Sequence, residues 1–178
     1  IGGGGPENIR LFPTAGGGAK GGFFGDPYQG FLELEYAPSK NFALRLQYSG
    51  GEIFGSHFNG FGINFDWAVN QKFGIFGRYG YATYPDTSLG DISPNYWSAG
   101  IGLRDLFIPK ALAGIAIGQP LIENAVGNAT QTNFEAFYNF PVSDRLRVTP
   151  LIQVITNPAN QEANGTIITG TLRTVFSF

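Results

Sequence analysis

The sequence contains no cysteine and no methionine among its 178 residues, and it has a single histidine. The absence of cysteine excludes disulfide bonds, zinc–thiolate sites and cysteine nucleophiles. Charged residues make up only 13%, about half of the roughly 25% that is usual for a soluble domain. The net charge is -2 and no basic run is present, which argues against a nucleic-acid-binding module. Because methionine is missing even at position 1, we expect the chain to be processed or to be a piece of a longer protein.

Long apolar runs are missing as well. The longest spans about eight residues, 111–118, far short of the roughly 18 that a membrane-spanning helix needs. No signal peptide is visible at the start of the chain. What the chain has instead is 27 glycines and 15% aromatic residues, a composition that excludes intrinsic disorder. The mean hydropathy of -0.02 would by itself indicate a soluble protein, but the periodicity of the sequence does not.

Apolar and polar residues alternate from Gln29 to the end of the chain, with the period of two that is typical of β-strands. We count nine alternating segments, at residues 29–37, 41–49, 58–69, 72–83, 95–105, 111–118, 132–140, 145–156 and 165–178. Most are about 9–12 residues long, close to the about 9–11 that a tilted strand needs to cross a bilayer. Residues 1–26 are rich in glycine and are predicted to form a loop, with one weak strand near residues 8–13.

The two faces of these segments differ in composition. One face consists of aliphatic and aromatic side chains and carries no charge in any segment. The other holds all the strand charges, seven basic and four acidic, among Gly, Asn, Gln, Ser and Thr. This basic excess suggests a weak preference for anions. If the polar face lines a lumen, we predict these pore-lining residues: Glu33, Glu35, Arg45, Asn64, Asp66, Arg78, Arg104, Glu135, Arg147, Gln153 and Arg173.

Four of these charges fall near the middle of the predicted strands. Arg45 and Arg78 lie near mid-strand, with Glu33 and Glu135 near the same level. They could line a constriction and set a transverse field that selects solutes by charge. Alternatively, they are ordinary lumen charges that pair across neighbouring strands.

Two architectures fit such an alternation: a soluble barrel or sandwich with its apolar face inside, and an outer-membrane barrel with its apolar face toward lipid. Aromatic residues near strand ends favour the second, because they suit an interfacial girdle: Tyr36, Trp67, Phe73, Trp97, Phe140 and Phe178. Short connections at 38–40, 70–71, 106–110 and 141–144 also alternate with long ones at 50–57, 84–94, 119–131 and 157–164, like periplasmic turns and external loops. A terminal aromatic residue, here Phe178, is similar to the C-terminal recognition signal of bacterial outer-membrane barrels.

We therefore predict an all-β fold, an antiparallel transmembrane outer-membrane β-barrel. The last strand follows a long loop, so it should run from the outside to the periplasm. With nine strands, the first strand would then also start on the outside, whereas a complete bacterial barrel has an even number of strands. Either residues 6–14 form a tenth strand or, as we favour, the chain is the C-terminal part of a larger barrel. In this division residues 1–26 are a Gly-rich outer loop or preceding segment, and residues 27–178 are barrel strands.

No catalytic or metal site is predicted. Glu33 and Glu35 share one wall and have no partner across a sugar, as the carboxyl groups of a glycosidase do. His57, the only histidine, falls in a predicted loop, and without cysteine it cannot form a convincing transition-metal cluster. The G-x-G-x-x-G pattern at residues 16–21 neither follows a strand nor opens a helix, so it does not indicate nucleotide binding. We expect no enzymatic activity, no cofactor and no metal.

Several stretches resemble a known family. They are YWSA at residues 96–99 and GIAIGQP at 114–120, followed by NFEAFY at 133–138, VTP at 148–150, Gln153, NP at 157–158 and GTLRT at 170–174. Together they are similar to the OprB-type carbohydrate-selective porins, and in particular to their cyanobacterial branch, the S-layer-homology-domain or iron-uptake porins. The resemblance covers residues 27–178 and is strongest after residue 94.

The resemblance implies a barrel of about 16–18 strands, usually a homotrimer, that passes small hydrophilic solutes such as sugars and inorganic ions. It implies a place in the outer membrane of a Gram-negative-type, cyanobacterial cell. It also implies insertion by the barrel-assembly machinery through the strand that ends at Phe178, and cell-wall contact through an N-terminal domain absent from this sequence. Two alternatives stay open: a structural outer-membrane barrel with a plugged lumen, and a soluble lipid- or pigment-binding β-barrel.

Overall fold

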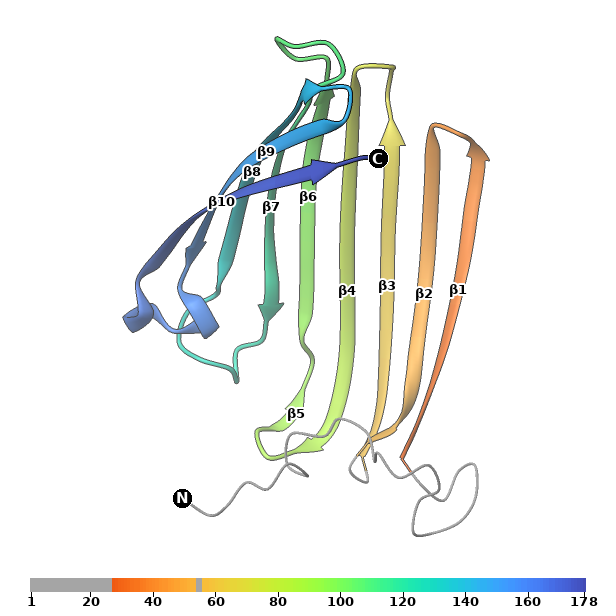
Figure 1. Ribbon diagram of the computed structural model, residues 1–178. Coiled ribbons are helices and arrows are strands. Elements are labelled where there is room, and N and C mark those ends of the chain that lie inside the picture. Colours follow the sequence, from red (N-terminus) through yellow and green to blue (C-terminus); the bar gives the residue numbers. More distant parts are fainter. Residues whose placement is uncertain (1–26, 54–55) are drawn as a thin grey trace.

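The computed structural model describes residues 27–53 and 56–178 as one antiparallel sheet (Figure 1). The strands are β1 (Tyr28–Ser39), β2 (Phe42–Ile53), β3 (Ser56–Ala68), β4 (Phe73–Thr87), β5 (Gly90–Ile92), β6 (Asn95–Arg104), β7 (Leu112–Ile122), β8 (Thr132–Ser143), β9 (Leu146–Thr156) and β10 (Thr166–Phe176). Two 3-10 turns, η2 (Pro158–Asn160) and η3 (Glu162–Asn164), follow β9. Neither helical element in the described ranges is long or apolar enough to span a membrane. The predicted all-β antiparallel fold is confirmed.

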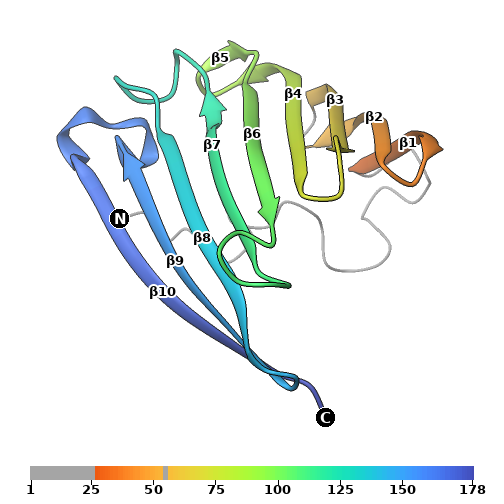
Figure 2. The ribbon, with the colours of Figure 1, turned by 90° about the horizontal axis from the view of Figure 1, so that it is seen from above.

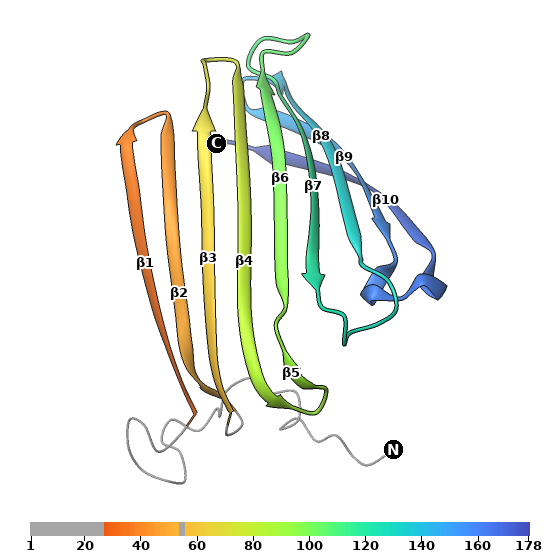
Figure 3. The same ribbon diagram turned by 180° about the vertical axis from the view of Figure 1, so that it is seen from behind.

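The sheet is a curved wall with two open edges. Its strands follow the order β1-β2-β3-β4-β6-β7-β8-β9-β10, while the short β5 pairs with β4 alone. Seen from above, the strands form an arc, with β1 and β10 at its two ends (Figure 2). The turns that follow β1, β3, β6 and β8 lie at one end of the wall, and the two longest connections, at residues 123–131 and 157–165, lie at the other (Figure 3). Each of the nine predicted segments corresponds to one long strand, whereas the predictions for residues 1–26 lie outside the described residues.

Two of the predicted long loops are wrong, because the strands continue through them. β2 continues to Ile53 and β3 already begins at Ser56. β4 continues to Thr87 and pairs with β5. His57, predicted in a loop, therefore lies in β3 opposite Glu52. The face that is predicted to be free of charge therefore carries the Glu52 carboxylate at the loop end of β2. Backbone pairing sustains these strand ends where the apolar alternation has already stopped, so the alternation underestimated their length.

A continuous register joins the apolar side chains of all the long strands. Residues directly opposite each other in an antiparallel pair point to the same side of the sheet. One such row crosses the wall through Tyr36, Leu44, Phe65, Gly77, Ala99, Ile117, Phe134, Val154 and Ile168. The apolar positions of the separate segments therefore form a single face, which we call the apolar face; the opposite side is the polar face.

The apolar face packs against no second layer of the described protein. Phe58 and Ala111 are the only buried hydrophobic residues in the described ranges. On the apolar face, by contrast, Ile115 is 55% exposed and Leu172 is 69% exposed. A water-soluble domain of this size would bury most such side chains, since their burial is the main favourable term in folding. A continuous exposed apolar face is what a lipid-facing wall requires.

Hydrogen bonds lock the two longest connections together around Asn160, which is only 3% exposed. The Asn160 side chain accepts a bond from the Gln131 amide at 2.8 Å and donates to the Leu121 carbonyl at 3.2 Å. Its own carbonyl accepts bonds from the amides of Asn128 and Ala129. The connections at residues 123–131 and 157–165 therefore form one ordered unit, and the Ser93 amide joins it to the β5–β6 segment through Glu123.

Replacing Asn160 with alanine should loosen this unit. The change leaves the part-buried Gln131 amide and Leu121 carbonyl without these partners, each at a cost of about 1–3 kcal/mol. It also places alanine at a φ of 59°, which asparagine tolerates better. We expect amide hydrogen exchange across residues 123–131 to accelerate about 30- to 150-fold, with β4 unaffected. Asn160→Gly keeps the backbone angle and isolates the side-chain loss, and unchanged exchange in the alanine variant would contradict the role of Asn160.

Candidate functional site

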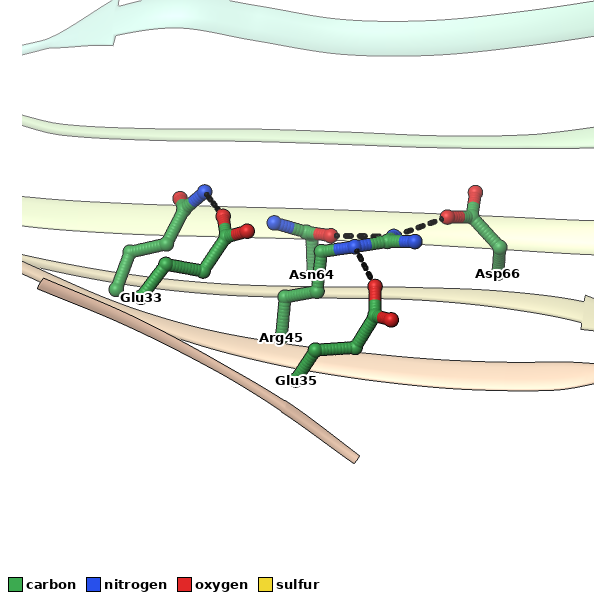
Figure 4. A network of polar contacts seen from close by, with 6 residues as sticks. Glu33, Glu35, Arg45, Asn64 and Asp66 are labelled. Atoms are coloured by element: carbon green, nitrogen blue, oxygen red, sulfur yellow. Dashed lines mark hydrogen bonds and ion pairs between the residues drawn. The ribbon is translucent and has the colours of Figure 1, made fainter. Parts of the chain in front are cut away.

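The polar face carries a network of polar contacts centred on Arg45 of β2 (Figure 4). The Arg45 Nε atom lies 2.6 Å from Glu35 Oε2 on β1, and its Nη1 atom lies 2.7 Å from Asp66 Oδ2 on β3. The same Nη1 donates a longer hydrogen bond of 3.4 Å to Asn64 Oδ1. The register places Glu35 and Asn64 directly opposite Arg45. The guanidinium therefore connects three neighbouring strands.

The Arg45 network is open to water and rich in negative charge. The side chains of Arg45, Glu35 and Asp66 are 29%, 48% and 55% exposed, so water screens each ion pair and its contribution to stability is small. Beside it, Gln47 Nε2 donates to Glu33 Oε2 at 2.6 Å. Three carboxylates thus accompany one guanidinium on β1–β3, which leaves this part of the polar face acidic. Its effect on stability is small, and its larger effect is on the local electric field.

A second polar cluster spans β8, β9 and β10. Gln153 Nε2 donates to Glu135 Oε2 at 2.7 Å, and Thr169 Oγ1 donates to Gln153 Oε1 at 3.5 Å. Glu135 and Gln153 lie directly opposite each other, and Gln153 lies opposite Thr169. The cluster is therefore a row of direct cross-strand neighbours.

The remaining predicted arginines lie on β4–β10, and none of them forms an ion pair within the described residues. Arg78 lies over the Phe76 ring, 5.7 Å from its centroid. Arg147 Nε donates to Asn139 Oδ1 at 2.7 Å, and its Nη2 donates to the Lys110 carbonyl at 2.7 Å. Near the same end of the sheet, Arg104 lies opposite Leu112 and Arg173 lies opposite Thr149.

The register shows which mid-strand charges share a level. Glu35, Arg45, Asn64 and Arg78 lie opposite one another in a single row. Glu33 lies two residues from Glu35 toward the loop end, and Glu135 belongs to the Asp66 row, on the turn side. Acidic residues thus dominate β1–β3, whereas unpaired arginines dominate β4–β10. The sequence predicts that these residues lie on the polar face, but only the register shows that Glu35, Arg45 and Asp66 lie close together.

Aromatic residues on the polar face were missed by the sequence analysis. Phe76, Tyr96 and Phe137 each lie directly opposite a glycine of the neighbouring strand: Gly100, Gly80 and Gly114. A Cβ atom added at Gly100 would lie 2.4 Å from the Phe76 ring, and the other two glycines are equally close to their rings. Each ring therefore lies over bare backbone, which explains why glycine occupies these strand positions. An aromatic residue opposite a glycine is a signal that could be found only once the register is known.

The predicted girdle residues lie near both ends of the apolar face. Tyr36, Trp67, Phe73 and Phe140 lie toward the turns. Trp97 lies toward the loops, where its indole N–H donates to Gln119 Oε1 at 2.9 Å. On β4, Phe73 and Tyr81 are eight residues apart, or about 26 Å along an extended strand, comparable to the about 25 Å apolar band of membrane barrels. Phe178 follows β10 and is fully exposed.

No group of three or more His, Asp or Glu side chains suited to a metal gathers in the part of the chain that the structure describes. The polar face offers hydrogen-bonding groups and charges that are distributed along the sheet. Such a surface can contact a passing hydrated solute at many points.

Comparison with known proteins places this wall in a family. The family model described as carbohydrate-selective porin, OprB family, matches residues 15–178. The uncharacterized protein alr4550 of Nostoc sp. (strain PCC 7120) is 29% identical over 189 residues, covering 88% of this chain and 33% of that protein. The uncharacterized protein sll0772 of Synechocystis sp. (strain PCC 6803) is 35% identical over 103 residues, covering 52% of this chain and 19% of that protein. The chain thus spans about a third or less of these cyanobacterial relatives. Because the family match includes every described strand, the chain belongs to the OprB family of carbohydrate-selective porins, and its sheet is the wall of an outer-membrane β-barrel.

Proposed function

We propose that the chain forms part of a water-filled outer-membrane channel through which small hydrophilic solutes diffuse passively. The observation that carries this proposal is the division of one continuous sheet into an exposed apolar face and a face lined by hydrated charges. In an outer-membrane barrel these faces meet lipid and lumen, respectively. Diffusion through such a lumen needs no nucleophile, cofactor or energy source, so we propose a transport role without catalysis.

The open edges of the sheet support a larger barrel. Among the described strands, β1 and β10 each pair with a single neighbour, so each has one edge that no other described strand covers. Unpaired backbone groups cannot be left in hydrocarbon, where water is not available to bind them. We propose that residues 27–178 are the C-terminal strands of a barrel of about 16–18 strands, whose other strands pair with β1 and β10. Residues 1–26 would then be an outer loop or a preceding segment.

The proposed pore-lining set is the one named from the sequence, with the Arg45 network as its acidic part and Arg78, Arg104, Arg147 and Arg173 as its basic part. Sugars and inorganic ions are the proposed solutes, since the wall offers amides and hydroxyls together with both signs of charge. Family membership also supports a homotrimer, insertion by the barrel-assembly machinery through the strand near Phe178, and cell-wall contact through an N-terminal domain.

Single-channel conductance of the full-length protein in a planar bilayer tests the proposed function. We expect stable conductance steps, and under a salt gradient a reversal potential of the sign that indicates a weak preference for anions. Vesicles containing the protein should also swell in small neutral sugars and progressively less in larger ones. A folded barrel that gives neither conductance nor swelling would instead support a structural barrel with a plugged lumen.

A further inference from the structure

The two ends of the wall carry opposite charge. Each of the four turns between long strands at one end contains an exposed basic residue, and these are Lys40, Lys72, Lys110 and Arg145. In the described residues, the strand ends and connections at the opposite end contain no lysine or arginine; their acidic residues are Glu52, Asp86 and Asp91 in the strands and Glu123 and Glu162 in the connections. The turn end is therefore the basic end of the wall.

None of these four turn cations forms an ion pair within residues 27–53 and 56–178. The two acidic residues in the same turns, Asp105 and Asp144, form no ion pair with them in the described residues. Asp105 instead accepts a hydrogen bond from the main-chain amide of Lys110 at 2.7 Å, which shapes the turn. Four exposed cations without carboxylate partners at one rim form a surface complementary to anions outside the protein.

One of these turns is also strongly apolar. In the β6–β7 turn, Leu106 lines a shallow depression of the apolar face together with Leu103, Ala113 and Tyr138. The Tyr138 hydroxyl donates to the Leu106 carbonyl, which holds the turn against this face. The next residue, Phe107, is 89% exposed and has a φ of 60°, a conformation that is unusual for a bulky residue. The fold thus presents a large aromatic side chain outward at the edge of the apolar face.

We propose that the turn end docks on the anionic phospholipid headgroups of the leaflet beside it. Phe107 enters the interface next to the lipid-facing side chains, and Lys40, Lys72, Lys110 and Arg145 bind lipid phosphates. The apolar turn selects lipid over a water-soluble polyanion, because a soluble polymer would use the cations but would leave Phe107 in water. This proposal rests on the proposed membrane barrel.

A fluorescent label tests the apolar part. Because these 178 residues contain no cysteine, Phe107→Cys can carry one environment-sensitive dye in the full-length protein, with any cysteine outside this sequence replaced. The matched control is Leu89→Cys, in the β4–β5 connection at the opposite end, where Leu89 is 54% exposed. In vesicles of phosphatidylcholine with phosphatidylglycerol, a quencher near the lipid headgroups should quench the dye at position 107 and not at 89. A dye at 107 that reports bulk water in a conducting preparation would overturn the proposal while leaving the channel function intact.

A charge variant tests the cationic part. In mixed vesicles, the wild-type protein should enrich phosphatidylglycerol over phosphatidylcholine among its bound lipids, as measured by native mass spectrometry. The combined variant Lys40→Gln, Lys72→Gln, Lys110→Gln and Arg145→Gln should lose at least about fivefold of this enrichment, since one basic residue near an anionic surface contributes about 1 kcal/mol. Its conductance shows that the variant has folded and inserted. Unchanged enrichment, or cation-dependent binding of soluble polyphosphate without lipid preference, would overturn the proposal.

Discussion

Replacing Ile115 with arginine should reduce the free energy of folding into a bilayer by about 2–4 kcal/mol, the cost of arginine on the lipid face near the midplane. Ile115 lies near the middle of β7 on the apolar face, between Ile101 and Ala136 in the register. The neighbouring residue supplies a matched control. Ala116 lies on the polar face directly opposite Glu135, so an arginine there meets water and a carboxylate. We expect Ala116→Arg to cost about 1 kcal/mol or less, the scale of an exposed ion-pair change.

Reversible unfolding of the full-length protein from lipid vesicles by guanidinium measures both variants. The emission of Trp67 and Trp97 on the apolar face can follow the transition. The comparison is informative because the two substitutions introduce the same side chain one residue apart, on opposite faces of the sheet; they differ otherwise only in the side chain removed, isoleucine or alanine. A larger loss for Ala116→Arg than for Ile115→Arg would mean that the polar face, and not the apolar face, is excluded from water, and it would contradict the assignment of the two faces to lumen and lipid.

The alternation in the sequence predicted the strands and their faces because a lipid-facing wall imposes a period of two wherever it crosses the bilayer. Beyond the apolar band that constraint ends, and the sequence signal ends with it. The stretch at residues 50–53 therefore looked like part of a loop, although its backbone groups pair with β3 as in any other part of β2. For the same reason His57 was placed in a loop rather than in a strand.

The contacts on the polar face could not be predicted from the apolar–polar alternation alone. Glu35, Arg45 and Asp66 could each be assigned to this face, but their proximity depends on which residues lie opposite one another. The register of β1 against β2 follows from their turn, which pairs Ser39 with Phe42, and the register of β2 against β3 follows from the next turn, across which Ile53 pairs with Ser56. A change of one residue in either turn would separate the three charges. The glycines beneath Phe76 and Phe137 depend on register in the same way.

The second large effect concerns ion selectivity. Arg45→Gln should shift the channel toward cations, because the substitution leaves Glu35 and Asp66 without their common cation. A unit charge at about 4 Å in water changes the energy of a passing ion by about 1 kcal/mol. We therefore expect the cation-to-anion permeability ratio to rise about two- to fivefold, as read from the reversal potential under a salt gradient. The free energy of unfolding should change little, because both ion pairs are exposed to water.

Two companion variants separate charge from geometry. Arg45→Lys keeps the positive charge, so it should retain most of the wild-type selectivity, although lysine cannot reproduce the planar contacts with both carboxylates. Lys40→Gln removes the same amount of charge from the β1–β2 turn, outside the network, and should shift the reversal potential less than Arg45→Gln. If Lys40→Gln instead produced the larger shift, ions would sense the rim of the channel more strongly than the Arg45 wall. The acidic network would then be a structural link between β1, β2 and β3 rather than part of the selective surface.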